Sequence, residues 1–189
     1  MTNPRIAIYA GSFDPVTLGH MDIVRRGRRL FDELVVAVGR NPDKDQLFTA
    51  HERVEMLESL VAKIVEEEPH GPRIRVESYD GLTIDFAASI GARIILRGIR
   101  NLSDLHYEIQ QAITNHAVAD TETVFITSSQ FFAYTSSTLI KQVTALGNDL
   151  DRLSVMVPDL VIEKLKEKKR EGHPLLRRIA NASYQGDSD

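Results

Sequence analysis

Residues 5–20 read RIAIYAGSFDPVTLGH, and this stretch decides the fold. It opens with a short β-type run, after which Gly11 lets the backbone approach a ligand closely. Asp14 and Pro15 fix a turn, and residues 17–19 lead into a helix whose first amide groups can meet an anion. His20, in the first turn of that helix, would project toward the same space. The stretch predicts a strand, an anion-binding turn and a helix.

Short runs rich in Val and Ile recur along the chain and alternate with segments of helical period. The runs are residues 5–9, 33–39, 73–79, 93–97 and 123–127. Such runs are typical of strands that are covered on both faces, and their alternation with helices implies a parallel sheet. The pattern predicts an α/β fold: a single Rossmann-like domain with a five-stranded parallel sheet flanked by helices. Ligands of such sheets bind beyond the carboxyl ends of the strands.

Two of the intervening segments have the spacing of amphipathic helices. Residues 49–65 begin with a capping box made by Thr49 and Glu52, and residues 103–119 form the second segment. The apolar stripes consist of Val54, Leu57, Leu60, Val61 and Ile64 in the first and of Leu105, Ile109, Ala112 and Ile113 in the second. We expect both stripes to face the sheet.

The end of the chain differs in character from the rest. Residues 159–171 predict an amphipathic helix that Gly172 and Pro174 stop, and the residues after it have weak periodicity and a polar end. We therefore expect one domain over residues 1–170, with that helix in it, and a partly ordered C-terminal tail over residues 171–189.

Composition excludes several classes of protein. The chain has 189 residues, no cysteine and a net charge of −4. Without cysteine it can form neither a disulfide nor a thiolate metal site, and its acidic balance argues against a general nucleic-acid binder. No run approaches the ~18 apolar residues of a membrane span, and the N-terminus lacks the apolar region of a signal peptide. We expect a cytoplasmic protein that binds neither nucleic acid nor membranes.

A second group of polar residues follows the fourth run. Residues 96–108 read LRGIRNLSDLHYE: Arg97 ends the run, Gly98 opens a tight turn, and Arg100 projects from the loop. Two guanidiniums on a loop that leads into a helix favour anion binding. The end of a central strand is also a costly place for a charge without a function.

Other site types lack their motifs. The sequence contains neither the GxxxxGK(S/T) phosphate loop nor a GxGxxG turn after a strand, which argues against P-loop kinases and dehydrogenases. Its histidines show no ligand spacing for zinc, and no cluster of carboxylates marks a metal cage. We therefore name no residue as a metal ligand.

The opening stretch carries a family resemblance. Thr17, Gly19 and His20 match the (T/S)xGH signature of the nucleotidyltransferase superfamily, and the upstream GSFDP extends it. Together with the RGIR and DLHYE segments and TSSTLIK at residues 135–141, the opening resembles bacterial phosphopantetheine adenylyltransferases. The resemblance runs from about residue 6 to about residue 165, and it identifies residues 1–170 as a nucleotidyltransferase domain.

The resemblance implies an activity and partners. The family transfers the adenylyl group of ATP to 4′-phosphopantetheine, which gives dephospho-coenzyme A and pyrophosphate in coenzyme A biosynthesis. It also implies Mg²⁺ bound mainly through the ATP phosphates, a homohexamer, and feedback by coenzyme A.

The resemblance also implies the residues of the site. Those with catalytic roles are His20, Lys44 and Arg97. Those that bind ATP are Ser12, Phe13, His20, Gly98, Ile99, Arg100, Glu108, Phe132, Ala133, Tyr134, Thr135, Ser136, Ser137 and Thr138. Those that bind the phosphorylated acceptor are Ser12, Lys44, Thr83 and Arg97.

Three positions depart from the family pattern. His116 follows Asn115 where the family often has arginine, and Gln142 follows Lys141 where an acidic residue is common. Phe132 stands where a tryptophan is frequent, which is an aromatic replacement. The first two departures bear on acceptor binding and subunit contacts rather than on adenylyl transfer.

The implied reaction needs positioning and charge rather than a strong base, because the attacking phosphate is already anionic. Lys44 and Arg97 are expected to hold the acceptor phosphate and Arg100 the phosphates of ATP. His20 is expected to stabilise the α-phosphate oxygens. A histidine at a helix N-terminus is biased toward its neutral form, so we expect it to donate a hydrogen bond rather than transfer a proton.

Two alternatives stay open at this stage. One is another nucleotidyltransferase that acts on nicotinamide mononucleotide or an alcohol phosphate, although a cytidylyltransferase would have histidine where this chain has Thr17. The other is a regulatory module that binds nucleotide without turnover. The presence of Lys44 and Arg97, which a simple nucleotide binder does not need, argues against it.

Overall fold

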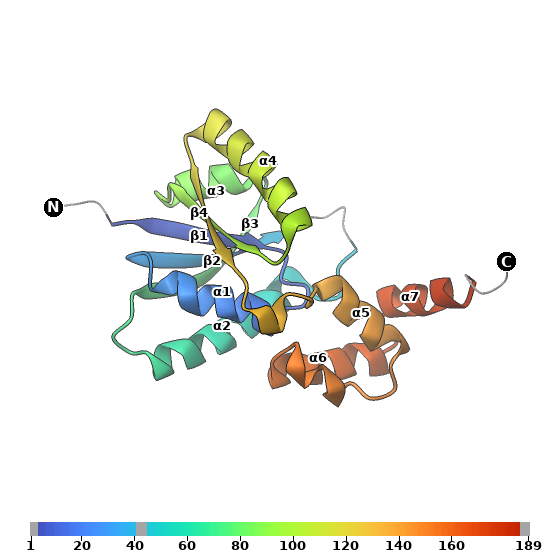
Figure 1. The fold of residues 1–189 in the computed structure, drawn as a ribbon. Helices are drawn as coiled ribbons and strands as arrows, with labels where there is room; N and C mark the ends of the chain where they lie inside the picture. The colour runs from blue at the N-terminus through green and yellow to red at the C-terminus, as the bar shows by residue number, and fades with distance from the viewer. Residues whose placement is uncertain (1–3, 41–44, 186–189) are drawn as a thin grey trace.

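The five β-type runs form one sheet in the computed structural model, which describes residues 4–40 and 45–185. All neighbouring strands are parallel, in the order β3-β2-β1-β4-β5 (Figure 1). The strands are β1 (Ile6–Gly11), β2 (Glu33–Arg40), β3 (Arg73–Asp80), β4 (Ile94–Ile99) and β5 (Glu122–Thr127). Each overlaps the run that predicts it, so the α/β class and the parallel five-stranded sheet are confirmed.

The strand order reverses beside β1. The chain proceeds outward from β1 through β2 to β3 and then returns to the other side of β1, where β4 and β5 follow. Ligands of open parallel sheets bind at such a point, beyond the carboxyl ends of the strands. Because β1 pairs with β4, with Tyr9 opposite Leu96, the two loops singled out in the sequence leave the sheet side by side.

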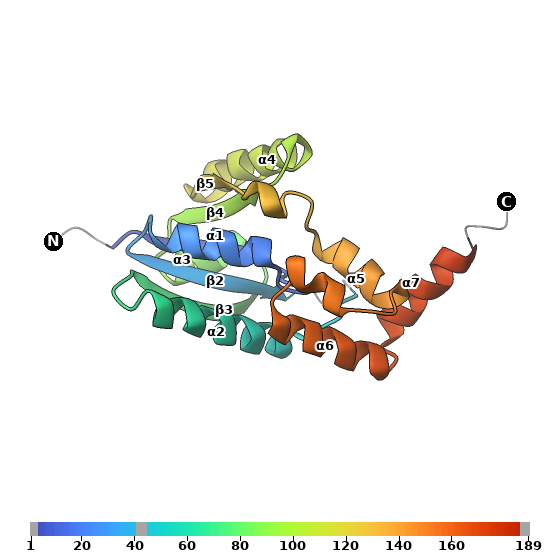
Figure 2. The same ribbon diagram turned by 60° about the horizontal axis from the view of Figure 1, so that its bottom comes forward.

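Helices cover both faces of the sheet (Figure 2). On one face lie α1 (Leu18–Arg28) and α2 (Ala50–Glu67), and on the other lie α3 (Thr83–Ser89) and α4 (Leu102–Ala119). Side chains of β1 alternate between the layers: Ala7 and Tyr9 pack in the α1–α2 cluster, and Ile8 and Ala10 pack in the cluster with Ala87 of α3. Both faces are therefore buried, which explains the continuous apolar runs.

Helix α2 agrees with its prediction. The Thr49 hydroxyl accepts a hydrogen bond from the Glu52 amide at 3.2 Å, and the Glu52 carboxylate accepts one from the Thr49 amide at 2.8 Å. This is the predicted capping box. The apolar stripe faces the sheet, with Leu57, Leu60, Val61 and Ile64 buried and Val54 partly buried.

Helix α4 lies where it is predicted, but its predicted inward face is wrong. Ile109 is 42% exposed and Ile113 is 65% exposed, while Leu105 and Ala112 are half-buried. Within this helix, all of which the structure describes, Glu108 alone is buried. The helix packs against β4 and β5 at the edge of the sheet, and a cavity lined by Arg97, Thr123 and residues of α4 lies between them. Its apolar side chains consequently remain exposed in the single chain.

The chain after the sheet forms a helical layer beyond the carboxyl ends of the strands (Figures 1 and 2). It comprises the short 3₁₀ helices η1 (Gln130–Phe132) and η2 (Asp151–Val155) and the α-helices α5 (Ser137–Leu146), α6 (Asp159–Arg170) and α7 (Pro174–Gln185). The predicted helix over residues 159–171 is confirmed as α6. Gly172, with a φ of 66°, follows the end of α6, and Pro174 is the first residue of α7.

The C-terminal tail, for which the sequence predicts partial order, contains one helix. This is the twelve-residue helix α7, which lies beyond residue 170. This helix packs against α5. Its residue Leu176 is buried in the main core cluster. No helix in the described ranges is both long and apolar enough to cross a membrane.

Candidate active site

A cavity of about 310 Å³ opens at the carboxyl ends of β1 and β4, where the fold predicts a ligand. The predicted ATP and acceptor residues that line it are Ser12, Phe13, His20, Arg97, Gly98, Arg100, Glu108, Phe132, Thr135, Ser136, Ser137 and Thr138. They come from β4 itself, from the loops after β1, β4 and β5, from η1 and α4, and from the first turns of α1 and α5. Positions about 120 residues apart in sequence therefore converge on one space.

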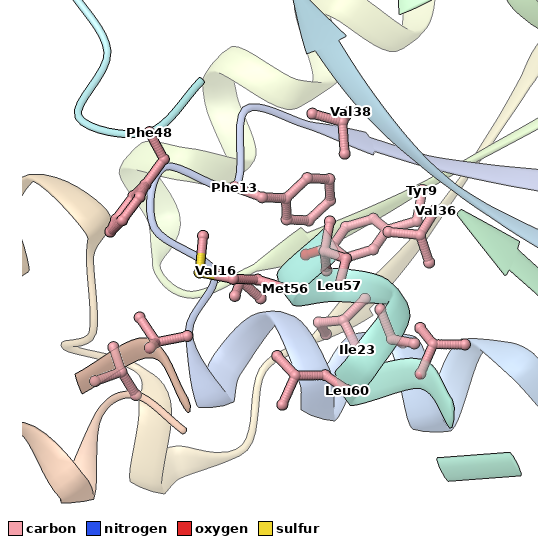
Figure 3. Packing of buried hydrophobic residues seen from close by; sticks show 14 of the residues in the cluster. Tyr9, Phe13, Val16, Ile23, Val36, Val38, Phe48, Met56, Leu57 and Leu60 are labelled. Atoms are coloured by element: carbon pink, nitrogen blue, oxygen red, sulfur yellow. The ribbon is translucent and has the colours of Figure 1, made fainter. Parts of the chain in front are cut away.

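The loop after β1 is anchored by Phe13. Its ring is 2% exposed and points into the cluster that holds Tyr9, Val38 and Leu57 (Figure 3). Its φ is 48°, a conformation that costs a non-glycine residue free energy and needs support from its surroundings. With the ring buried, the neighbouring Ser12 stays exposed at the cavity wall. Burial of the ring thus fixes the backbone that faces a ligand.

Asp14 holds the same loop from the other side. Its carboxylate is 3% exposed and accepts hydrogen bonds from the amides of Leu47 at 3.0 Å and Phe48 at 2.9 Å. It also pairs with the Lys141 ammonium group at 3.1 Å. One buried carboxylate therefore connects the loop after β1 with the segment before α2 and with α5.

His20 is held in one tautomer by the cap of its own helix. Its Nδ1 accepts a hydrogen bond from the Thr17 amide at 3.0 Å, and the His20 amide donates to the Thr17 hydroxyl at 3.1 Å. Because Nδ1 is an acceptor, the neutral ring carries its proton on Nε2. Burial, together with the nearby Arg100 and Arg97, lowers the pKa of His20 to about 4, and burial is the largest of these causes. The ring is therefore neutral, as predicted, but burial is the main reason rather than the helix terminus.

Arg97 is fixed by a bidentate pair with Glu108. Its Nε and Nη2 donate to the two carboxylate oxygens at 2.6 and 2.5 Å, and its Nη1 donates to the carbonyl of Ala10 at 2.6 Å. A guanidinium has five N–H donors, so two remain without a partner among the described residues. Glu108 lines the cavity, as predicted for an ATP contact, but both of its oxygens are engaged in orienting Arg97.

Arg100 connects the loop after β4 with the loop after β5. Its guanidinium donates to both carboxylate oxygens of Asp104, at 2.8 and 3.1 Å, and to the carbonyl of Thr135 at 2.9 Å. The side chain keeps 38% of its surface exposed. It is therefore held in place while part of it remains accessible to an anion.

The loop before α5 ends in a helix cap. The Ser136 hydroxyl accepts a hydrogen bond from the Leu139 amide at 3.1 Å, and the Ser137 hydroxyl donates to the carbonyl of Pro15 at 2.9 Å. The second bond ties this loop to the loop after β1. The cavity therefore meets the N-terminal ends of two helices, α1 and α5, whose amide groups favour anions.

A smaller cavity of about 170 Å³ adjoins the first. It contains Thr83, whose hydroxyl lies 2.7 Å from that of Tyr79, and it is also lined by residues of α4 such as Asn115. The two cavities share Ala10, Arg97 and Glu108 in their walls. The predicted acceptor residues Thr83 and Arg97 thus lie together, apart from most of the predicted ATP residues.

Some predicted residues lie outside these two cavities. Ile99 is buried, with 8% of its surface exposed, and Tyr134 is 89% exposed. Neither these two side chains nor Ala133 lines the larger cavity. Lys44 lies outside the described residues.

The structure also adds residues that the sequence does not reveal. Tyr9, Asp104 and Ser128 line the larger cavity, and Asp14 and Lys141 join its loops. Asp14 and Lys141 stand inside the GSFDP and TSSTLIK motifs, which is the only sequence signal for their roles. Among the described residues no group of three or more His, Asp or Glu side chains could hold a metal ion.

Comparison with known proteins identifies the class to which this fold and site belong. The model of the cytidylyltransferase-like family matches residues 8–143. Curated relatives then narrow the assignment. A phosphopantetheine adenylyltransferase from Lachnoclostridium phytofermentans is 42% identical over 165 residues, which cover 87% of this chain and 95% of the relative. Its counterpart from Geobacter metallireducens is 45% identical with the same coverage. The chain belongs to the phosphopantetheine adenylyltransferase family within the cytidylyltransferase-like proteins.

Solved structures show the same fold at low sequence identity. A bifunctional NMN adenylyltransferase/ADP ribose pyrophosphatase from Francisella tularensis matches with a TM-score of 0.62 and 14% identity, over 96% of this chain and 54% of that one. The Plasmodium falciparum nicotinic acid mononucleotide adenylyltransferase complexed with NaAD matches with a TM-score of 0.51 and 19% identity, over 86% and 95% of the chains. At this identity the likeness concerns the fold alone.

Proposed function

We propose that this protein transfers the adenylyl group of ATP to 4′-phosphopantetheine, with release of dephospho-coenzyme A and pyrophosphate. The observation that carries the proposal is the wall that the two cavities share at Ala10, Arg97 and Glu108. Two ligands that fill the two cavities meet at Arg97, which is the arrangement that a transfer between two phosphorylated molecules needs. The relatives at 42–45% identity carry the name of this enzyme, which favours 4′-phosphopantetheine as the acceptor.

ATP binds in the larger cavity in this proposal. Its phosphates meet the N-terminal turns of α1 and α5 and the Arg100 guanidinium, and Ser12 and Phe13 supply contacts from the loop after β1. The remaining ATP contacts that the family resemblance implies, including Ala133 and Tyr134 of the exposed loop, stay part of the proposal. The pantetheine arm lies in the smaller cavity beside Thr83.

The reaction is an in-line attack by the acceptor phosphate on the α-phosphorus of ATP, with no covalent intermediate. The acceptor phosphate is held by Arg97 and by Lys44, which lies outside the described residues. His20 donates its Nε2 hydrogen to an α-phosphate oxygen. Because this donor is already in place before the reaction, it stabilises the charge of the transition state without reorganisation.

Mg²⁺ accompanies the ATP phosphates in this proposal. The carboxylates nearest the site, Asp104 and Glu108, are both engaged by arginines, so the oxygens that suit Mg²⁺ come mainly from the phosphates and water. When bound there, the ion would supply positive charge beside the pyrophosphate oxygens.

The family resemblance also leads us to propose a cytoplasmic homohexamer. The exposed apolar side chains of α4, among them Leu102, Ile109, Ile113 and Val118, provide a surface for subunit contact. Feedback by coenzyme A fits the same site, because that molecule joins an adenine nucleotide to a pantetheine arm. We further propose that residues 1–170 contain the catalytic machinery and that the tail over residues 171–189 is an addition to it.

The experiment is a measurement of pyrophosphate released from ATP with Mg²⁺ and a panel of acceptors. We expect release with 4′-phosphopantetheine and none above background with nicotinamide mononucleotide or glycerol 3-phosphate. Release only with another acceptor would assign the chain a different substrate. Nucleotide binding without release for every acceptor would favour a regulatory module and overturn the proposal.

A further inference from the structure

Arg53, in the first turn of α2, is a buried charge that the proposed reaction does not use. It is 1% exposed. Its guanidinium donates to four backbone carbonyls and one side-chain amide. The acceptors are Ser12 O at 2.6 Å, Gly39 O at 3.1 Å, Phe48 O at 3.1 Å, Thr49 O at 3.3 Å and Gln46 Oε1 at 2.7 Å.

These acceptors belong to separate parts of the edge where the site lies. Ser12 is in the loop after β1, Gly39 is near the end of β2, and Gln46 belongs to the segment just before α2. Asp14 joins the same two loops in the opposite sense, since its carboxylate accepts from the amides of Leu47 and Phe48. Two buried charges therefore cross-link the two loops. Arg53 on α2 binds carbonyl groups, and Asp14 on the loop after β1 binds amide groups.

The chemistry of the contact requires arginine. Burial lowers the pKa of Arg53, which reflects the cost of placing a charge there. No carboxylate is among the hydrogen-bond acceptors that the described residues offer it. A planar fork with several fixed donors can bridge carbonyls of three segments at once, whereas a lysine ammonium is a compact point charge that cannot span them.

We propose that Arg53 is a positioning residue for the transfer reaction. It fixes the loop over residues 11–16 against the segment over residues 45–49, so that Ser12 keeps one position between the two substrates. The inference rests on the proposed function and on the family resemblance, which implies that Ser12 contacts both ATP and the acceptor. In-line transfer depends on alignment, and a shift of a loop misplaces the reacting groups even when both ligands still bind.

The chain offers a matched control in Arg28. This residue of α1 is 2% exposed, and its guanidinium also donates to backbone carbonyls: Pro72 O at 2.6 Å, Glu68 O at 3.1 Å and Ile64 O at 3.4 Å. These carbonyls lie at the opposite end of the sheet, in the last turn and C-cap of α2 and in the segment before β3. Substitution of Arg28 therefore perturbs a buried arginine of the same kind away from the site.

The kinetic test compares Arg53→Lys with Arg28→Lys. Both variants are assayed at a temperature below their unfolding midpoints. We expect Arg53→Lys to lower kcat/KM for 4′-phosphopantetheine by on the order of 10²-fold. The Kd of ATP should change less than about threefold, because most of its proposed contacts lie on the loops after β4 and β5. Arg28→Lys should lower the unfolding midpoint. It should leave kcat/KM for 4′-phosphopantetheine and the Kd of ATP near the wild-type values. Equal kinetics for the two variants would overturn the proposal.

A second measurement needs no activity. Amide hydrogen exchange of Leu47 and Phe48, whose amides bond Asp14, reports the junction between the two loops. We expect faster exchange there in Arg53→Lys and wild-type exchange there in Arg28→Lys. Unchanged exchange in Arg53→Lys would overturn the positioning role. Absence of pyrophosphate release from the wild type would instead refute the proposed function, so the two failures are distinguishable.

Discussion

The charge state of His20 follows from two contacts that act on different parts of the ring. The Thr17 amide occupies Nδ1, and burial together with Arg100 and Arg97 opposes protonation of the ring. The result is a neutral donor with its hydrogen on Nε2. A charged imidazolium would need solvation that this site does not give, whereas a neutral donor can meet a phosphate oxygen without a proton transfer.

His20→Ala should reduce kcat by roughly 10²-fold, the order found when a single donor to a developing oxyanion is removed. The substitution also removes half of the capping box, which costs about 1 kcal/mol of stability. His20→Gln is the matched variant, because glutamine at this position of a capping box can still accept from the Thr17 amide. Steady-state pyrophosphate release and urea unfolding of both variants check the prediction. Turnover near that of the wild type in His20→Ala would contradict the role.

Stability should depend on pH through His20. Its folded-state pKa of about 4 lies below the ordinary value of 6.5, so at intermediate pH the unfolded chain binds the proton that the folded chain does not. The contribution is fully present above 6.5 and is lost as the pH falls toward 4. Between about pH 7 and about pH 5, the free energy of unfolding should fall more for the wild type than for His20→Gln. The same fall in both proteins would contradict the assignment.

The sequence predicts which charged residues belong to the site better than it predicts their hydrogen-bond and ion-pair partners. Arg97 is conspicuous because it is a charged residue near the carboxyl end of a central strand. Its partner Glu108, however, lies on the next helix, and the partner of Asp14, Lys141, is 127 positions away. Arg53 occupies a position where an amphipathic helix would tolerate an exposed charge. Its burial depends on where two other loops pass, which no local pattern encodes.

At the level of elements, polar contacts tie each loop of the site to a neighbour. Ser137 of α5 bonds the loop after β1, Arg100 bonds the loop after β5, and Asp22 of α1 accepts from the Ser129 amide at 3.2 Å. Local periodicity predicts the strands and α2 because their burial pattern repeats along the segment itself. It fails for the inward face of α4, because what a helix buries at the edge of a sheet depends on its neighbours in the fold and not on its own period.

Helix α7 tests whether the tail contributes to stability or to chemistry. Leu176 is 4% exposed in the core cluster, so Leu176→Ala should lower the free energy of unfolding by about 2–5 kcal/mol. Because the site residues lie on other elements, kcat should stay close to that of the wild type. The control is Leu30→Ala, at a leucine that is 47% exposed. Urea titrations and pyrophosphate release give both quantities, and a loss of kcat in a folded Leu176→Ala would assign the tail a role in the reaction.

For the whole molecule, the sheet order explains why one site can take two ligands. The reversal beside β1 sets the loops of β1 and β4 next to each other, and Arg97 stands where the two cavities touch. The sequence predicts this meeting point, because it follows from the parallel sheet and from the position of the motifs after strands. It does not predict that the acceptor cavity is walled by α4 itself, which brings the smaller cavity close to the exposed face of that helix.

The exposed face of α4 predicts how subunits meet. Ile113 is 65% exposed in the single chain, and in a hexamer that uses this face it would become buried, where an introduced charge without a partner is costly. Ile113→Lys should therefore shift the mass measured by light scattering from that of a hexamer to smaller species. Val155→Lys is the control, because Val155 is 69% exposed but lies on η2, and it should leave the mass unchanged. A monomeric wild type would contradict the hexamer. An intact hexamer in Ile113→Lys would show that the subunits meet through a surface other than the exposed face of α4. Because α4 also lines the acceptor cavity, dissociation by Ile113→Lys should raise the KM for the acceptor more than that for ATP.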